Sequence, residues 1–124
     1  MKTSISANFT FEELACPHCM LLELHPHFLY HLQGLRTKIG YPFYVESCCR
    51  CEEHNLAVGG SSDSYHRTDL RGGTQAIDFR VDNGEIKADV LQYARNFGFY
   101  GIGVNKTAIH LDRRTFIFRS VWGY

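Results

Sequence analysis

The sequence contains no apolar run near the roughly 20 residues that a membrane-spanning helix needs. It also lacks a charge excess, because 13 basic and 13 acidic residues give a formal net charge of zero. The opening segment, Met1 to Phe11, has one Lys and no apolar centre, so it does not resemble a secretory signal. We therefore expect synthesis in the cytoplasm, no membrane insertion and no nucleic-acid partner.

Internal repeats, low-complexity segments and linkers are also missing from the sequence. A chain of 124 residues with 44% hydrophobic and 14% aromatic residues fits one folded unit with its own core. The expected organisation is a single domain over residues 1–124 that acts as a monomer.

Cysteine is present in an odd number, five, which argues against a complete disulfide framework. Cys16-Pro17-His18-Cys19 has the spacing of a zinc knuckle, and two of Cys48, Cys49 and Cys51 could complete a structural site. A disulfide between the two groups and reduced free thiols are equally compatible with the sequence. The chain also has seven His residues, a high number that favours metal binding but does not identify the ligands.

Helices are predicted mainly in the first half of the chain. Thr10 and Glu13 have the spacing of a capping box, and Pro26 opens a longer helix that Gly40 and Pro42 end. Apolar residues recur at helical spacing along this second helix, at Phe28, Leu29, Leu32, Leu35 and Ile39.

Short strands dominate the second half. The pattern predicts strands over Tyr41–Val45, Thr74–Val81, Phe99–Val104, Ala108–Asp112 and Thr115–Arg119, helices over Glu52–Val58 and Ile86–Phe97, and a polar loop over Ser61–Gly73. This order indicates an α+β fold with N-terminal helices packed on a small antiparallel sheet.

Three residues form a candidate metal site: His66 in the polar loop, Asp78 on a strand and His110 on a later strand. Two His and one carboxylate suit zinc, and three protein ligands leave a fourth position for water. Asp112 lies two residues after His110 and so shares its face of the strand. Such spacings are common by chance, so the pattern alone does not establish a site.

Three segments together resemble the signature of the zinc D-Ala-D-Ala carboxypeptidase family: Ser64-Tyr65-His66, Ala76-Ile77-Asp78 and His110-Leu111-Asp112. That family includes peptidoglycan carboxypeptidases and phage endolysins, and it shares its fold with hedgehog signalling domains. Further matches extend over nearly the whole chain, at Asn8–Thr10, Leu14–Cys16, Arg50–Asn55, Val58–Gly60, Gly101–Gly103 and Trp122.

The resemblance implies a zinc metallopeptidase that cuts a stem or cross-link peptide of bacterial peptidoglycan, as a carboxypeptidase or an endopeptidase. It implies His66, Asp78 and His110 as zinc ligands, and Arg50 as the residue that binds substrate or steadies developing negative charge. A phage-encoded protein that reaches the cell wall at lysis, or within a virion, would fit the missing signal. The alternative is a wall-binding or phage structural module that keeps the fold with little or no catalysis.

The sequence departs from the family pattern near the site. Residues within Arg67–Gly73 read as an insertion, which makes Asp69 a rival to Asp78; we prefer Asp78 because a strand fixes a ligand better than a loop. Several relatives carry a carboxylate three residues before the last His, where this chain has Thr107. Asp112 is therefore expected either to act as the general base or to orient His110.

Overall fold

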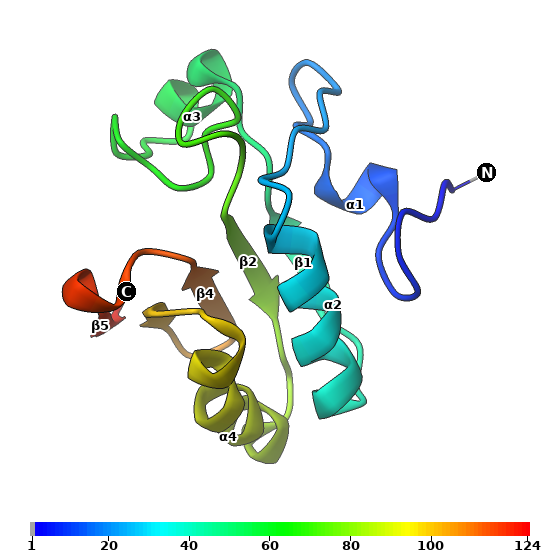
Figure 1. The fold of residues 1–124 in the computed structure, drawn as a ribbon, viewed down its shortest axis with the longest axis vertical. Helices are drawn as coiled ribbons and strands as arrows, with labels where there is room; N and C mark the ends of the chain where they lie inside the picture. The colour runs from blue at the N-terminus through cyan, green and yellow to red at the C-terminus, as the bar shows by residue number, and fades with distance from the viewer. Residues whose placement is uncertain (1) are drawn as a thin grey trace.

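A five-stranded sheet forms the centre of the structure, a computed structural model that describes residues 2–124 (Figure 1). The strands are β1 (Tyr44–Ser47), β2 (Ala76–Arg80), β3 (Gly101–Val104), β4 (Ala108–Asp112) and β5 (Ser120–Gly123), in the spatial order β1-β2-β4-β3-β5. Neighbours are antiparallel except that β5 runs parallel to β3. The predicted α+β class is confirmed, but the sheet is mixed rather than antiparallel.

Helices lie before the sheet in the chain and between its strands. They are α1 (Phe11–Leu14), α2 (Phe28–Ile39), α3 (Glu52–Ala57) and α4 (Gly84–Tyr93), with 3₁₀ turns η1 (Ala94–Phe97) and η2 (Phe116–Phe118). Figure 1 shows α2 and α4 in front of the sheet, with α3 beyond one end of β2. No helix within residues 2–124 has both the length and the apolarity needed to cross a membrane.

The local signals in the N-terminal half form as predicted. The Thr10 side chain accepts from the backbone N–H of Glu13, and the Glu13 carboxylate accepts from the backbone N–H of Thr10, which completes the capping box of α1. Helix α2 begins two residues after Pro26 and ends at Gly40, whose φ of 78° lies in the left-handed region.

The core lies between the helices and one face of the sheet. Helix α2 contributes Leu32 and Leu35, and β2 contributes Ile77 and Phe79; all four side chains are fully buried. The rings of Phe43 and Phe79 stack with centroids 4.2 Å apart. Because strand side chains alternate, burying these β2 residues turns the residue between them, at position 78, to the other face.

The strand predicted over Thr115–Arg119 is wrong. This segment forms the 3₁₀ turn η2, and the last strand starts only at Ser120. Phe116, Ile117 and Phe118 are all exposed, so their apolar side chains have no core face to occupy. The β-branched and aromatic residues of this segment suggested a strand, but without burial against a core they do not form one.

Two glycines give a matched test of backbone freedom. A Cβ at Gly40 or Gly84 would meet no atom within 4 Å, but only Gly40 has a positive φ. We expect Gly40→Ala to lower the free energy of unfolding by about 1 kcal/mol through left-handed strain, and Gly84→Ala in α4 to raise it by roughly 0.5 kcal/mol. Urea denaturation of both variants checks this, and equal effects of the two would contradict it.

Candidate metal centre

Three side chains from separate segments meet on the sheet face opposite the one that packs against α2 and α4. His66 comes from the loop before β2, Asp78 from β2 and His110 from β4, and one potential ligand atom of each lies within 4.8 Å of the other two. The register of the sheet places Asp78 directly opposite His110. The structure thus brings together the three residues that the sequence singled out as metal ligands.

His66 is held with one ring nitrogen facing this cluster. Its side chain is only 3% exposed, and its Nδ1 lies 2.7 Å from the carbonyl oxygen of Cys48. A carbonyl only accepts hydrogen bonds, so Nδ1 carries a proton, and in the neutral ring Nε2 is then the atom that can bind a metal. That Nε2 lies 3.2 Å from Asp78 Oδ2 without hydrogen-bond alignment, and it has no hydrogen-bond partner within residues 2–124.

His110 lies between two carboxylates. Its Nδ1 is 2.7 Å from Asp78 Oδ1, and its Nε2 is 2.8 Å from Asp112 Oδ2. The Asp112 bond fixes the ring so that Nδ1 points toward Asp78 and His66. A carboxylate behind a metal-binding imidazole commonly sets its orientation in this way.

Asp112 is closed off from solvent by its other partner. Its side chain is 1% exposed, and Arg114 binds both of its oxygens through Nε at 2.9 Å and Nη2 at 2.8 Å. Gly101 makes room for this pair, because a Cβ there would lie 2.1 Å from Asp112 Oδ1. Of the two roles open for Asp112, this geometry favours orienting His110. Sequence reasoning missed Arg114, although its spacing of two residues from Asp112 was a possible signal.

Arg50 lies beside the cluster and is fixed on three sides. Its guanidinium donates to Ser47 Oγ at 2.9 Å, to Asn55 Oδ1 at 3.4 Å and to Asp78 Oδ2 at 3.3 Å. Burial lowers the pKa of Arg50 and Asp78 partly offsets this, but a guanidinium stays charged. Gly60 is required here, because a Cβ would lie 2.2 Å from Asn55 Oδ1. Asn55 and Gly60 carried no role in the sequence analysis beyond belonging to a matching segment.

The insertion does not supply a ligand. Asp69 is exposed and its carboxylate binds Arg67 at 2.6 Å, outside the three-residue cluster. Arg71, which has a φ of 53°, instead stacks over the ring of Tyr65 with its guanidinium carbon 3.9 Å from the centroid. The same Arg71 lines the pocket next to His110, so the insertion shapes the cleft.

Two adjoining pockets open beside the cluster, with volumes of about 570 Å³ and 450 Å³. Both are lined by His110 and Trp122, whose ring centroids are 5.4 Å apart. Arg50 lines the smaller pocket, while Arg71 and Arg114 line the larger one. Arginines therefore line the cleft on both sides of His110, together with Asp63 and Asp112 in the larger pocket and Asp78 in the smaller one.

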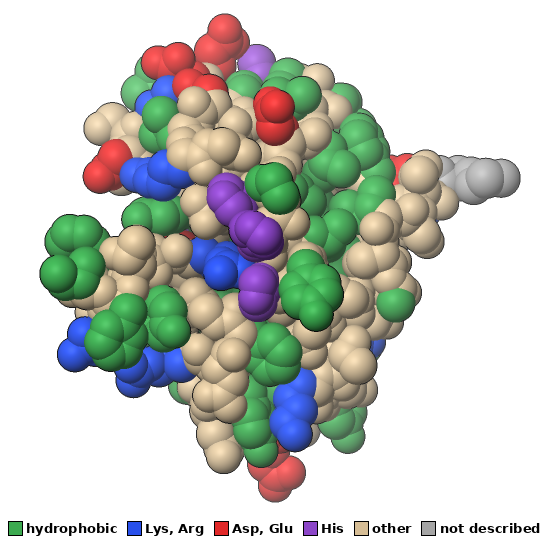
Figure 2. Space-filling view, viewed as in Figure 1, with side chains coloured by type: hydrophobic (Ala, Val, Ile, Leu, Met, Phe, Trp, Pro, Cys, Tyr) green, Lys and Arg blue, Asp and Glu red, His purple; other side chains and the backbone are tan. Residues whose placement is uncertain are grey.

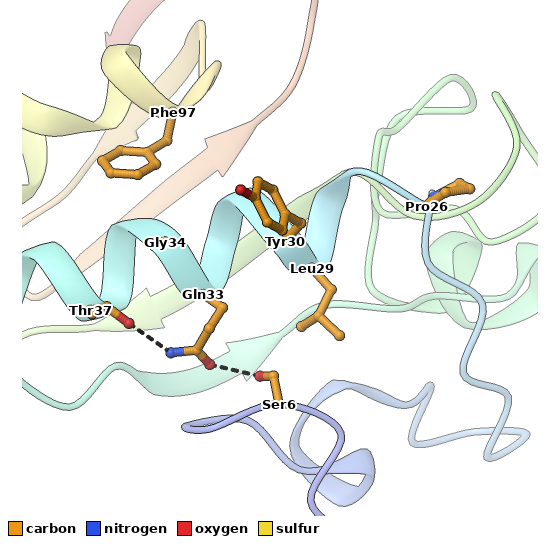
Figure 3. A pocket seen from close by; sticks show the side chains of 8 residues that line it. All are labelled: Ser6, Pro26, Leu29, Tyr30, Gln33, Gly34, Thr37 and Phe97. Atoms are coloured by element: carbon orange, nitrogen blue, oxygen red, sulfur yellow. Dashed lines mark hydrogen bonds between the residues drawn. The ribbon is translucent and has the colours of Figure 1, made fainter.

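The remaining surface features lie apart from this centre. Figure 2 shows several His side chains gathered in a row on one face of the molecule. The rings of His25, His27 and His31 follow one another, with neighbouring centroids 5.4 and 6.5 Å apart. A groove of about 640 Å³ runs along α2 (Figure 3). Its amide, Gln33, is satisfied by Ser6 and Thr37, and no residue of the metal cluster lines it.

Charge is balanced within the cluster without any metal. Burial lowers the pKa of His110, but its bonds to Asp112 and Asp78 outweigh this and raise the pKa to about 9. Burial raises the pKa of Asp78, but its hydrogen bond with His110 holds it well below the usual range. Burial acts in the same direction on Asp112, and Arg114 and His110 hold its pKa well below the usual range. A proton on His110 Nδ1 therefore lies between this nitrogen and Asp78, where a bound cation would compete with it.

These shifts predict how the metal-free protein responds to pH. The raised pKa of His110 stabilises the fold fully below the unfolded value near 6.5, and this contribution is lost as pH rises through about 9. The depressed pKa values of the carboxylates act oppositely, so their contribution is lost in acid. We expect the titration of His110 to make the free energy of unfolding, measured in chelator, on the order of 2–3 kcal/mol higher at pH 6 than at pH 10.

The variant His110→Asn separates this contribution from other titrating groups. Its deficit in the free energy of unfolding relative to the wild type, measured by urea denaturation in chelator, should shrink as pH rises from 6 to 10. A deficit that is constant across this range would contradict the assignment.

Comparison with known proteins agrees with this geometry. The sequence profile described as Peptidase M15 matches residues 7–112, which include all three residues of the cluster, Arg50 and Asp112. No curated protein matches the chain at the significance required. Because the profile covers most of the chain, this protein belongs to the peptidase M15 family.

Proposed function

We propose that this protein is a zinc metallopeptidase that hydrolyses a peptide bond of bacterial peptidoglycan. The observation that carries the proposal is the buried, unpartnered Nε2 of His66, which faces Asp78. A buried polar atom without a partner costs free energy, and a metal ion would satisfy it. Membership of a peptidase family supports a metal at this position.

The donor set suits zinc. His66 Nε2, His110 Nδ1 and an oxygen of Asp78 would hold the ion, and two imidazoles with one carboxylate are typical of catalytic rather than structural sites. Zinc bound there would supply an activated water and polarise the scissile carbonyl. The proton that holds His110 between the carboxylates would leave Nδ1, while Nε2 keeps its bond to Asp112.

Arg50 is proposed to bind the carbonyl oxygen of the scissile bond. Its three hydrogen bonds fix the guanidinium before substrate arrives, and it lines the pocket that contains His66 and His110. A preorganised cation stabilises negative charge that develops on this oxygen without further reorganisation. Asp112 is proposed as a positioning residue that keeps the His110 ring aligned.

The peptidoglycan substrate is supported by the resemblance and by the charge of the cleft. Stem peptides carry free carboxylates, and Arg71 and Arg114 line the larger pocket beside His110. Both carboxypeptidase and endopeptidase action fit this arrangement. Action after phage lysis or from a virion remains part of the proposal.

The second candidate is a cell-wall-binding module with little turnover. Thr107 cannot act as a general base, and Asp112 has both oxygens engaged. Among the carboxylates within residues 2–124 that line the two pockets, only Asp63 is exposed. This shortage of a free carboxylate is the specific feature that favours binding without catalysis.

The zinc-loaded protein should release fragments from purified peptidoglycan, and His110→Ala should release none. Mass spectrometry of the soluble products identifies the cleaved bond from the new chain ends. If wild-type protein shown to hold zinc at this centre releases nothing but still sediments with peptidoglycan, the binding module replaces the enzyme.

Asp112→Asn and Asp63→Asn form a matched pair that tests the two roles of a carboxylate. With Asp112 as a positioning residue, Asp112→Asn should weaken zinc affinity about 10- to 100-fold, and much of the activity should return at saturating zinc. If Asp112 is the general base, Asp112→Asn should instead lower kcat about 100-fold or more and leave the zinc affinity unchanged. Competition with a chelating dye measures the affinity, and fragment release measures kcat.

The same measurements on Asp63→Asn complete the pair. We expect near-normal zinc affinity and activity, since Asp63 is exposed and outside the ligand cluster. A large loss of kcat with zinc retained in this variant would assign the base to Asp63.

A further inference from the structure

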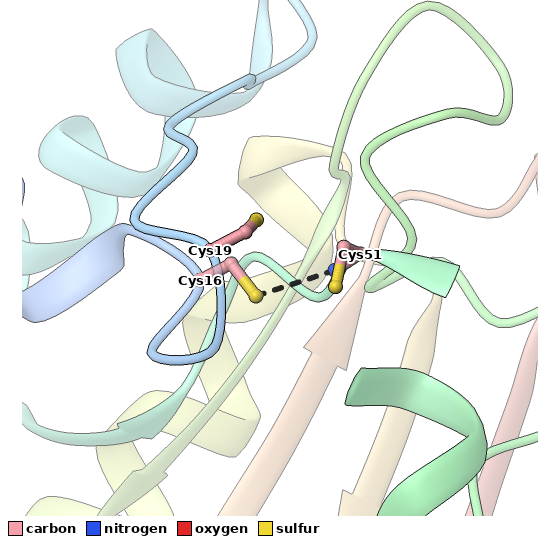
Figure 4. A group of neighbouring side chains, drawn as sticks. All are labelled: Cys16, Cys19 and Cys51. Atoms are coloured by element: carbon pink, nitrogen blue, oxygen red, sulfur yellow. Dashed lines mark hydrogen bonds between the residues drawn. The ribbon is translucent and has the colours of Figure 1, made fainter. Parts of the chain in front are cut away.

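A second group of potential metal ligands lies outside the candidate centre. Cys16, Cys19 and Cys51 each place a sulfur within 4.8 Å of the other two (Figure 4). The first two follow α1, while Cys51 precedes α3, so two segments more than thirty residues apart in sequence converge here. None of the three forms a disulfide in the structure.

The segment that carries Cys16 and Cys19 is folded back on itself. The Cys16 N–H donates to the Leu21 carbonyl at 2.8 Å, and the Met20 N–H donates to the Cys16 carbonyl at 2.7 Å. Met20 has a φ of 60° and a side chain that is 55% exposed, so packing does not compensate its left-handed backbone. This strained turn reverses the chain and so places the sulfur of Cys19 next to that of Cys16.

The sulfur atoms accept backbone hydrogen bonds. The Cys51 N–H lies 3.4 Å from Cys16 Sγ, and the His54 N–H lies 3.3 Å from Cys51 Sγ. Donors directed at sulfur favour the thiolate, which is the form that binds metal. Nearby, His18 Nδ1 lies 3.4 Å from Cys51 Sγ, close to the separation of about 3.6 Å for sulfur and nitrogen on one tetrahedral zinc.

We propose that Cys16, Cys19 and Cys51 bind a structural zinc ion, with His18 as the fourth ligand. Three thiolates and one imidazole form a closed tetrahedral set of the kind that structural zinc sites use. His18 is half exposed, so its ring can turn from Cys51 toward the centre of the three sulfurs. Thiolates also distinguish this site from the peptidase centre, which offers only nitrogen and oxygen.

An open path leads to this site. A surface pocket of about 350 Å³ is lined by Cys19 and Cys51 and by the acidic residues Glu52, Glu53 and Asp69. Carboxylates at the mouth of this pocket attract a divalent cation and offset part of the free-energy cost of removing its water as it enters.

The site would act on the peptidase centre through Arg50. Cys51 directly follows Arg50, and the backbone of Arg50 is paired with the loop that carries His66, through N–H to the His66 carbonyl at 2.9 Å. A zinc ion at Cys51 would anchor this short irregular segment to the one that follows α1. Its loss would therefore loosen Arg50 while leaving the three ligands of the peptidase centre in place.

Elemental analysis of protein purified under reducing conditions without chelator tests the proposal. We expect two zinc ions per wild-type chain, one in Cys19→Ser, one in His110→Ala and none in the double variant. Cys49→Ser is the matched control: its sulfur is buried and faces the Glu23 carbonyl, so it should keep both ions. One ion in the wild type and an unchanged count in Cys19→Ser would overturn the proposal.

Cobalt substitution gives a readout that does not depend on variants folding well. Cobalt-loaded wild type should show intense thiolate-to-cobalt charge-transfer absorption in the near ultraviolet, and His110→Ala should keep it. Absence of this band from the wild type, or an intact mass two hydrogens below the reduced chain, would assign a disulfide or free thiols instead. Because His110→Ala removes only the peptidase centre, failure of one site is distinguishable from failure of the other.

His18→Ala tests the fourth ligand. The charge-transfer band should remain, because three thiolates remain, but cobalt affinity measured by titration should fall at least about tenfold. Unchanged affinity would remove His18 from the ligand set.

Discussion

The pairing of β2 with β4 is the constraint on which the rest of the site depends. Asp78 faces His110 because Ile77 is paired with Leu111 and Phe79 with Ile109 in the same register. These apolar partners are buried, so a slip by one residue would turn them to solvent and move both polar side chains into the core. The burial of apolar side chains on one face of the sheet thus fixes the distance between Asp78 and His110 on the other face.

The charges on the polar face are compatible only because each has a partner. Asp78 and Asp112 would repel across the ring of His110, yet each accepts from one of its nitrogens. Arg114 neutralises Asp112 from behind, and Arg50 reaches Asp78 from the side. One side of the cluster is left open at His66 Nε2, a buried nitrogen that lies 3.2 Å from Asp78 Oδ2 and has no hydrogen-bond partner within residues 2–124. A cation is the species that completes such a balance, whether a proton on His110 or a metal between all three residues.

Sequence patterns predicted those features that depend on neighbouring residues. Alternation along residues 74–81 indicated a strand with Asp78 away from the core, and the spacing of Thr10 and Glu13 indicated a helix start. The pairing of β5 parallel to β3 has no local signal, because it depends on where the chain returns after η2. For the same reason, the resemblance led to the metal-site residues and Arg50, while the bonds that hold Arg50 became visible only in three dimensions.

The segment between β1 and α3 links the two proposed metal sites. Within four residues, the Cys48 carbonyl orients His66, the Arg50 side chain reaches Asp78, and Cys51 joins the cysteine cluster. The segment lies outside the helices and the named strands, so its position depends on these ties and on the burial of its first two side chains. The backbone of Arg50 is fixed as well, because its N–H donates to the His66 carbonyl at 2.9 Å and its carbonyl accepts from the Thr68 N–H at 3.0 Å. An arginine that is to stabilise charge by preorganisation needs both its backbone and its side chain held in this way. A zinc ion at Cys51, as proposed, would add one more tie at the residue next to Arg50. The proposed thiol site would therefore reinforce the arginine of the candidate metal centre through the chain segment that the two sites share.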